Sequence, residues 1–548
     1  MKKTYITFVV GLLFIVTCCG RQSRSQGGAS YIASGLANKE MVADSSTAFS
    51  GDEVMAGSAV RRLAPGTPEM TPEQMNTESY SHIQENKFKD AVKEPLSTFS
   101  IDVDTASYSN MRRFLTQNKL PPKDSVRIEE LINYFSYNYP LPEDKVPFSR
   151  SMEVAECPWN KENWLVKIGV QGYEIEAQEL PPMNLVFLLD VSGSMSSPQK
   201  LPLLKTAMGM LTDELRAQDT VSIVVYAGAA GLVLPPTAGN DKQKILGAFS
   251  SLSAGGSTNG GEGIQLAYSI ATQNFIPGGV NRVVLATDGD FNVGISNEGG
   301  LVRLIEHKRE SGIFLTVLGM GMYNLNDSTM EKLADKGNGN YSYIDTLAEA
   351  RKALVEELSS TLFTIAKDVK IQVEFNPSYV ASYRLIGYEN RLLAAEDFND
   401  DNKDAGEIGA GHTVTALYEV VPSGNVSRGG NVDDLKYQEE RELSQQSFTN
   451  EILTLKMRYK APDGDTSELL TSTLPLPIKS LNETSTSFRF AAAVAAYGLL
   501  LRDSQFKGSA SMELVRSLAL SAQGDDPYRK EFVDLVGIAG TLLRIQNP

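Results

Sequence analysis

Four short, continuously apolar segments alternate with amphipathic segments over residues 184–364, and this alternation most constrains the fold. The apolar segments are NLVFLLD, TVSIVVYAG, NRVVLATDGD and IFLTVLGMG. Runs rich in Val, Ile and Leu without polar alternation are typical of strands buried on both faces. The segments between them repeat apolar residues at helical spacing. The pattern predicts an α/β unit with a doubly wound, mainly parallel sheet covered by helices.

Segments with alternating apolar and polar residues on both sides of this unit indicate a β-rich domain. NWLVKIGVQGY precedes the unit, and VKIQVEFN, TVTALYEVVP and EILTLKMRYKAP follow it. This arrangement favours an α/β unit inserted between two β-rich halves, residues 151–173 and 369–477. The C-terminus is predicted to be helical, and its apolar stretch 488–501 is too short to span a bilayer, which favours a buried core helix.

These patterns divide the chain into consecutive regions. We predict a helical and β region over 86–183, the α/β unit over 184–364, a β-rich domain over 365–480 and a helical region over 481–548.

The N-terminus is typical of an exported protein. Two lysines followed by ITFVVGLLFIVT predict a signal peptide over residues 1–19. The IVTCCG that follows resembles a bacterial lipoprotein signal, which implies acylation of Cys18 or Cys19 and anchoring in the cell envelope at the outer membrane, on its periplasmic or surface face. The alternative is an ordinary secretory signal with two incidental cysteines. Residues 20–85 contain too few apolar side chains for a core and predict a disordered tether.

The charge of the chain bears on its partners. The formal net charge is -16, and Cys157 is the one cysteine outside the N-terminal pair. Nucleic acids and anionic membrane surfaces require clustered Lys and Arg, so this balance argues against both as partners, with the lipid anchor as the membrane contact. Cations fit better, and a disulfide framework within the chain is excluded.

Oxygen-bearing side chains follow the apolar segments at three places. DVSGSM places Asp190 at the end of the first segment and Ser192 and Ser194 just after it, SAGGSTNGGEG presents Thr258 in a Gly-rich loop, and ATDGD places Asp288 where the apolar run of the third segment stops. Ligands of such sheets bind outside the carboxyl ends of the strands, so we expect these side chains to converge. Five oxygens with two carboxylates suit a divalent cation that can accept one more anionic oxygen. The alternative is a polar turn with an incidental Thr and Asp.

The residues DVSGSM, GGSTN and ATDGD resemble the metal-ion-dependent adhesion site of a von Willebrand factor type A domain. The resemblance implies Mg²⁺ bound directly by Ser192 and Ser194, by Thr258 when the site is engaged, and largely through water by Asp190 and Asp288. It also implies a protein partner that supplies a Glu or Asp to the ion. The sequence leaves Ca²⁺ or Mn²⁺ open, although small hydroxyl ligands favour a compact octahedral ion.

Segments outside the α/β unit carry a second resemblance. EPLSTFSIDVDTASYSNMRRFL, LPPKDSVRIEELINYF, RLIGYENRLL and EDFNDDNKDAGEIGAGHTVTALYEVVP are similar to the YfbK-like family of bacterial von Willebrand domain lipoproteins. The resemblance implies the architecture of that family, which has no settled biochemical role.

A weaker metal candidate lies in DFNDDNKDAGEI. Asp397, Asn399 and Asp401 have the spacing of a calcium loop, but Asn402 and Ile408 replace the Gly and the closing Glu of an EF-hand. A solvated acidic loop is the favoured interpretation.

Catalysis is the least favoured function. The chain has three histidines and lacks the G-x-S-x-G, H-E-x-x-H and C-x-x-C motifs, and Asp290 is the one candidate base beside the predicted metal. We therefore predict a non-enzymatic, lipid-anchored protein that binds another protein through a metal bridge. The alternatives are a structural assembly factor of the envelope, whose metal only stabilises loops, and then a metal-dependent hydrolase.

Overall fold

The computed structural model describes residues 78–143, 146–176, 179–257, 260–289, 298–322, 324–424 and 443–546. The predicted signal peptide, Cys18, Cys19 and the tether as far as residue 77 lie outside the described residues, as do Thr258 and Asp290. None of the helices within these ranges is long and apolar enough to cross a membrane.

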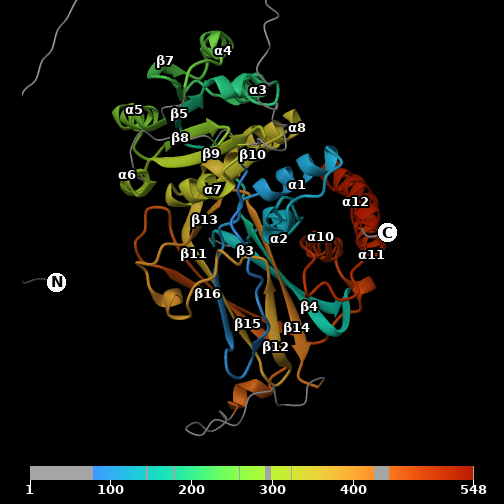
Figure 1. The fold of residues 1–548 in the computed structure, drawn as a ribbon. Helices are drawn as coiled ribbons and strands as arrows, with labels where there is room; N and C mark the ends of the chain where they lie inside the picture. Colours follow the sequence, from blue (N-terminus) through green and yellow to red (C-terminus); the bar gives the residue numbers. More distant parts are fainter. Residues whose placement is uncertain are drawn as a thin grey trace, which may run out of the picture. The chain divides into compact units, whose positions relative to one another are not determined.

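The α/β unit is a six-stranded sheet with helices on both faces (Figure 1). The strand order is β10-β9-β8-β5-β6-β7, and every pair is parallel except β6 with β7. The strands are β5 (Met183–Asp190), β6 (Thr220–Tyr226), β7 (Ala230–Ala238), β8 (Val280–Thr287), β9 (Phe314–Met320) and β10 (Tyr341–Ile344). The helices are α3 (Leu201–Glu214), α4 (Lys242–Ser251), α5 (Gly260–Gln273), α6 (Glu298–Glu310), α7 (Asp327–Lys336), α8 (Leu347–Arg351) and α9 (Leu358–Leu362), with a π-helix at Lys352–Glu356 between the last two. The predicted doubly wound, mainly parallel sheet is confirmed.

Strand β5 shows why the predicted strands are continuously apolar. Leu185 and Phe187 belong to the core beneath α3 and α4, whereas Val186 and Leu188 belong to the core beneath α5, α6 and α7. Successive side chains of a strand point to opposite faces, so a strand covered on both faces must be apolar at every position.

Two further sheets pack face to face as a β-sandwich. One has the order β1-β12-β14-β4-β3, and in the other β11 pairs with β13, β15 and β2, while β16 pairs with β15. Their apolar inner faces share one core. The strands are β1 (Lys89–Asp90), β2 (Leu96–Ser100), β3 (Phe148–Cys157), β4 (Asn160–Gly172), β11 (Thr364–Phe375), β12 (Val380–Ile386), β13 (Gly406–Gly409), β14 (Thr413–Pro422), β15 (Glu451–Lys460) and β16 (Glu468–Pro475).

The α/β unit is an insertion in this sandwich. Strand β4 precedes the unit and β14 follows it, yet they pair antiparallel from Trp164 with Val420 to Gln171 with Thr413. The chain leaves the sandwich after β4, near Tyr173, and returns to it before β11, at Phe363. The loop between β13 and β14 contacts both places: the Gly411 N–H donates to the Tyr173 carbonyl at 2.8 Å, and the Ala410 N–H donates to the Phe363 carbonyl at 2.9 Å.

Helices cover the outer face of the β3, β4 and β14 sheet (Figure 1). They are α1 (Ala106–Thr116), α2 (Ile128–Asn133), α10 (Thr486–Arg502), α11 (Met512–Leu520) and α12 (Pro527–Gln546). From Phe490 to Leu499 every residue of α10 is buried. The apolar stretch 488–501 therefore forms a core helix, as predicted.

The last residues of the predicted tether are part of the folded structure. Residues 78–85 fall in the predicted tether, but the Ser79 N–H donates to the Leu325 carbonyl at 3.1 Å. The Glu78 carboxylate accepts two hydrogen bonds from Arg113, at 2.8 and 3.0 Å. Arg113 is 5% exposed and needs an anionic partner, which orders this short polar segment.

Three largely buried arginines join the other layers to the α/β unit. Arg112 on α1, Arg127 before α2 and Arg391 after β12 each contact two carboxylates of the unit. Arg112 pairs with Asp345 and Glu349. Arg127 pairs with Asp327 and Glu331, and Arg391 pairs with Asp335 and Glu331. Buried charges persist only when paired, so these contacts tie the unit to its surroundings at fixed positions.

Candidate metal centre

The predicted site lies at the carboxyl end of the two central strands of the α/β sheet. Asp190 is the last residue of β5, and Asp288 directly follows β8. The two strands pair in parallel with Leu189 beside Ala286, so both carboxylates emerge at one edge. Both residues are fully buried. The Thr287 hydroxyl donates to Asp190 Oδ2 at 3.4 Å.

The two serines lie with these carboxylates. The Ser192 N–H donates to Asp190 Oδ1 at 2.8 Å, and the Ser192 and Ser194 hydroxyl oxygens are 3.0 Å apart. The Ser194 hydroxyl also donates to Asp288. Ser192 is 2% exposed, whereas Ser194 is exposed to solvent. The structure thus brings together four of the five predicted ligands and leaves one hydroxyl open to an approaching molecule.

The Gly-rich loop that contains Thr258 is held against the serine loop. The Gly255 N–H donates to the Val191 carbonyl at 2.7 Å, and the Gly193 N–H donates to the Gly256 carbonyl at 3.1 Å. Gly256 has a φ of 87°, a conformation that side-chain-bearing residues rarely adopt. Thr258 itself lies outside the described residues, so its role as a ligand stays a prediction.

Lys200, which the sequence analysis did not single out, belongs to this site. Its ammonium group donates to Asp288 Oδ2 at 2.8 Å and to Asn324 Oδ1 at 3.2 Å. Lys200 precedes α3 and is only 7% exposed. A lysine beside a helix start is usually a surface residue, and its sequence position carries no sign of this contact. The amphipathic pattern of α3 could not have located it.

The two carboxylates differ electrostatically. Burial raises the pKa of Asp190, and so does the charge of Asp288, against the hydrogen bonds from Ser192. Burial also raises the pKa of Asp288, but hydrogen bonds from Lys200 and Ser194 outweigh it and hold this pKa below its usual value. Asp288 is thus the more readily ionised of the two, and Lys200 already balances its charge.

These donors fit a hard divalent cation. Two carboxylates and two hydroxyls are the oxygen ligands that Mg²⁺ prefers, and Lys200 compensates only one of the two buried carboxylates. Ser192, Ser194, Asp190 and Asp288 would hold the ion, which would supply a positive charge open to an external carboxylate. The site has only two carboxylates, and the described part of the chain contains no group of three or more His, Cys, Asp or Glu side chains placed to bind a metal.

In the weaker metal candidate, the loop of Asp397, Asn399 and Asp401, the oxygen atoms already contact lysine side chains. The Lys403 ammonium group lies 3.3 Å from Asp397 Oδ2, and Lys370 and Lys460 donate to the carbonyls of Asp397 and Asp401 at 3.1 and 2.6 Å. Asn399 ends a 3-10 turn, Glu396–Asn399. Three ammonium groups in one loop repel a cation, which favours a structural acidic loop here.

The chain matches known families along most of its described length. The profile for "von Willebrand factor type A domain" matches residues 184–357, "Uncharacterized protein YfbK, C-terminal" matches 360–542, and "von Willebrand factor" matches 74–167. The Uncharacterized protein YfbK of Escherichia coli (strain K12) is 45% identical over 472 residues, which cover 84% of this chain and 81% of that protein. The chain belongs to the YfbK family. Its α/β unit is a von Willebrand factor type A (VWA) domain.

More distant similarities of this YfbK-family chain are confined to parts of it. The human inter-alpha-trypsin inhibitor heavy chain H4 is 28% identical over 166 residues, which cover 29% of this chain and 18% of that protein. The conserved hypothetical protein BatB from Bacteroides thetaiotaomicron is 27% identical, with a TM-score of 0.28, over 32% of this chain and 97% of that one. A von Willebrand factor type A structure from Catenulispora acidiphila is 17% identical, with a TM-score of 0.39, over 72% of this chain and 89% of that one.

Proposed function

We propose that this YfbK-family protein is a lipid-anchored protein of the bacterial cell envelope whose VWA domain binds Mg²⁺ and recognises another protein through a carboxylate of that partner. The observation that supports the proposal is the cluster of Asp190, Ser192, Ser194 and Asp288 at one sheet edge, with Ser194 exposed. A bound ion there would be neutralised by two carboxylates and would still attract a third.

The proposed role is recognition and not catalysis. The described side chains at the cluster are carboxylates, hydroxyls, the Asn324 amide and one ion-paired lysine. His307 lies on α6 and His412 lies in the loop between β13 and β14, so neither is at the cluster. Metal-assisted hydrolysis needs a base beside the attacking water, and Asp290, the candidate for it, lies outside the described residues.

Titration of the purified protein with Mg²⁺ tests the metal site. At about a hundredfold excess over Kd, binding should stabilise the folded chain by about 2.7 kcal/mol, seen as a rise in Tm. Ser194→Ala should abolish the rise, because it removes a ligand from an exposed position without disturbing the core. Ser196→Ala is the matched control, since Ser196 is an exposed serine of the same turn. Equal Tm shifts in both variants would exclude the site.

Capture of partners from envelope extracts tests recognition. Wild-type protein and Ser196→Ala should retain a partner in Mg²⁺ and release it in a chelator, and Ser194→Ala should not retain it. Capture that survives both the chelator and Ser194→Ala would contradict metal-bridged recognition.

A structural assembly factor is the second candidate, and the Lys200 contact favours it. Lys200 balances Asp288 without an ion, so the loops are held together even when no metal is bound. This candidate predicts that metal raises Tm while partner capture stays independent of the chelator.

A further inference from the structure

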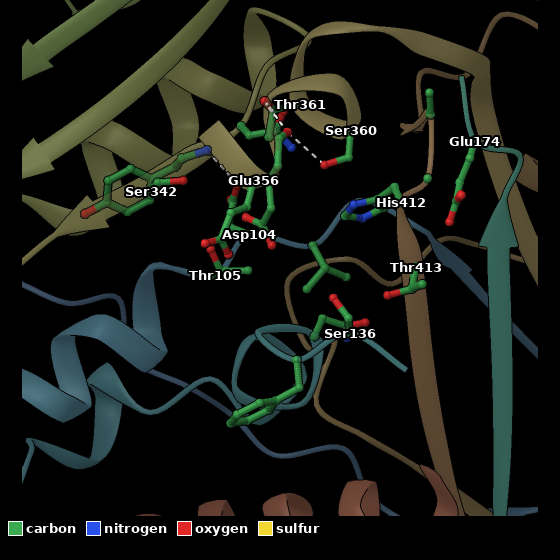
Figure 2. A pocket seen from close by; sticks show the side chains of 18 of the residues that line it. Asp104, Thr105, Ser136, Glu174, Ser342, Glu356, Ser360, Thr361, His412 and Thr413 are labelled. Atoms are coloured by element: carbon green, nitrogen blue, oxygen red, sulfur yellow. Dashed lines mark hydrogen bonds between the residues drawn. The ribbon is translucent and has the colours of Figure 1, made fainter. Parts of the chain in front are cut away.

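A cavity of about 340 Å³ lies where the VWA domain meets the sandwich and its helical layer (Figure 2). Its walls come from the loop before α1, the end of α2, the segment after β4, the start of β10, helix α9 and the loop between β13 and β14. Small-molecule sites typically occupy cavities of this size at domain junctions. A ligand bound here would touch all three parts of the molecule.

Six polar side chains that line the cavity have no hydrogen-bond or ion-pair partner within the part of the chain that the structure describes. They are the hydroxyls of Thr105, Ser136, Ser342 and Thr413, the carboxylate of Glu174 and the imidazole of His412. Figure 2 shows Glu174, His412 and Thr413 on one side of the pocket and Thr105 and Ser342 on the other. Ser342 is buried, Thr105, His412 and Thr413 are half-buried, and Ser136 and Glu174 are exposed, so each of them can exchange solvent for a ligand.

The other carboxylates of the cavity are engaged. Asp104 accepts from the Tyr341 N–H at 2.7 Å and pairs with Arg391 at 3.2 Å. Glu357 pairs with Lys352, and Glu356 accepts from the Tyr528 hydroxyl at 2.7 Å. These contacts balance Asp104 and Glu357 but leave the charge of Glu174 uncompensated.

No positive charge in the cavity wall opposes Glu174. None of the described residues that line the cavity is Lys or Arg. Burial and the nearby charge of Lys352 lower the pKa of His412 to about 4, so the imidazole is neutral at neutral pH. The wall therefore combines net negative charge with neutral groups that can donate or accept hydrogen bonds.

The backbone beside the cavity is irregular. The π-helix Lys352–Glu356 interrupts the helical segment that ends the VWA domain, and its last residue Glu356 lines the cavity together with Ser360 and Thr361 of α9. Single π-turns occur often at functional sites, because they redirect side chains from the regular helical positions.

We propose that this cavity binds a small hydroxylated organic ammonium ion of the amino-sugar class, with Glu174 holding the ammonium group and His412 with the hydroxyls of the wall holding the ligand hydroxyls. The site is separate from the metal centre, and its occupancy is independent of Mg²⁺.

Calorimetric titration of the folded protein with glucosamine tests the proposal, below neutral pH so that the amino group is protonated. Glucose is the matched neutral probe, because it has a hydroxyl in place of the ammonium group. We expect saturable binding of glucosamine at least tenfold tighter than that of glucose, since a charge-assisted hydrogen bond has about this effect. Equal affinities, or no saturable binding of glucosamine, would overturn the proposal.

Variants locate the binding. Glu174→Gln should weaken glucosamine about tenfold and leave glucose unchanged, because it removes the charge and keeps the shape. Glu310→Gln is the control, an exposed glutamate on α6 outside the cavity. Ser194→Ala should bind glucosamine like the wild type, which separates this site from the metal centre. A loss of affinity in Glu310→Gln or Ser194→Ala that equals the loss in Glu174→Gln would contradict a site in this cavity.

Discussion

Lys200 places a positive charge where an incoming cation needs Asp288. Its ammonium group lies 2.8 Å from Asp288 Oδ2, so a divalent ion bound by that carboxylate is repelled by the lysine or displaces it. The proposed affinity for Mg²⁺ is then a balance between the ion and a resident competitor from the same chain.

Substitution of Lys200 separates its stabilisation of buried Asp288 from its competition with Mg²⁺. Lys200→Met keeps the length of the side chain but leaves Asp288 buried without its counter-charge, so the metal-free protein should lose about 1 to 3 kcal/mol of unfolding free energy. Its Mg²⁺ affinity should rise about tenfold or more, since the repulsion is gone. Urea unfolding and Mg²⁺ titration measure both. Lys244→Met, which removes an exposed charge on α4, is the control, and an unchanged or weaker affinity in Lys200→Met would refute the competition.

His412 should make stability depend on pH. Its pKa is lowered from 6.5 to about 4, so between these values the unfolded chain binds the extra proton and the folded chain does not. The unfolding free energy should therefore fall as the pH drops through this window, by about 3 kcal/mol in full.

Carboxylates also titrate in this pH range, so comparing His412→Gln with the wild type isolates the contribution of the imidazole to the unfolding free energy. His412→Gln should flatten the profile of unfolding free energy between about pH 4 and 6.5. His307→Gln, on the exposed side of α6, should follow the wild type. Parallel profiles for His412→Gln and the wild type would show that the imidazole titrates normally.

At the level of elements, sequence patterns located the central strands but not the edges. Strands β5, β6, β8 and β9 are buried on both faces, and their apolar runs made them visible. Strand β7 was missed because it is an edge strand with exposed residues and two prolines, and β10 because it has only four residues. Short or half-exposed strands lack the length and the apolar runs on which such predictions depend.

The site was predictable to a similar degree. Asp190, Ser192, Ser194 and Asp288 end strands of recognisable pattern, and the rule for parallel sheets brings them to one edge. Lys200 and His412 reach their positions through contacts between segments far apart in the chain. No local pattern marks such contacts.

Substitution of Arg112 on α1 tests whether ion pairs hold the VWA domain to the helical layer. Arg112 contacts Asp345 and Glu349 of the VWA domain and Glu531 of α12, and it is 2% exposed. Arg112→Met should cost about 3 to 5 kcal/mol of unfolding free energy, because the buried carboxylates lose their partner. Arg303→Met, which changes an exposed arginine on α6, should cost almost nothing in the same chemical denaturation. A small loss in Arg112→Met would mean that the junction relies on apolar packing.

At the scale of the whole molecule, the ion pairs of Arg112, Arg127 and Arg391 lead us to expect that the VWA domain and the sandwich unfold cooperatively. Calorimetry of the wild type should show one transition, although the VWA domain has its own apolar cores. Replacing Arg112, Arg127 and Arg391 with Met should split it in two, and Mg²⁺ should then raise only the transition of the VWA domain. Two transitions in the wild type would show that the domains unfold independently.

The two adjacent connections of the inserted domain determine how a mechanical load would travel through the protein. The covalent path from the VWA domain to the sandwich runs through β4 and β11, and both are interior strands of their sheets. The loop at residues 410–411 bridges the two connections. Tension is thus shared by two covalent tethers that enter the middle of two sheets, so no edge strand is available to peel away first.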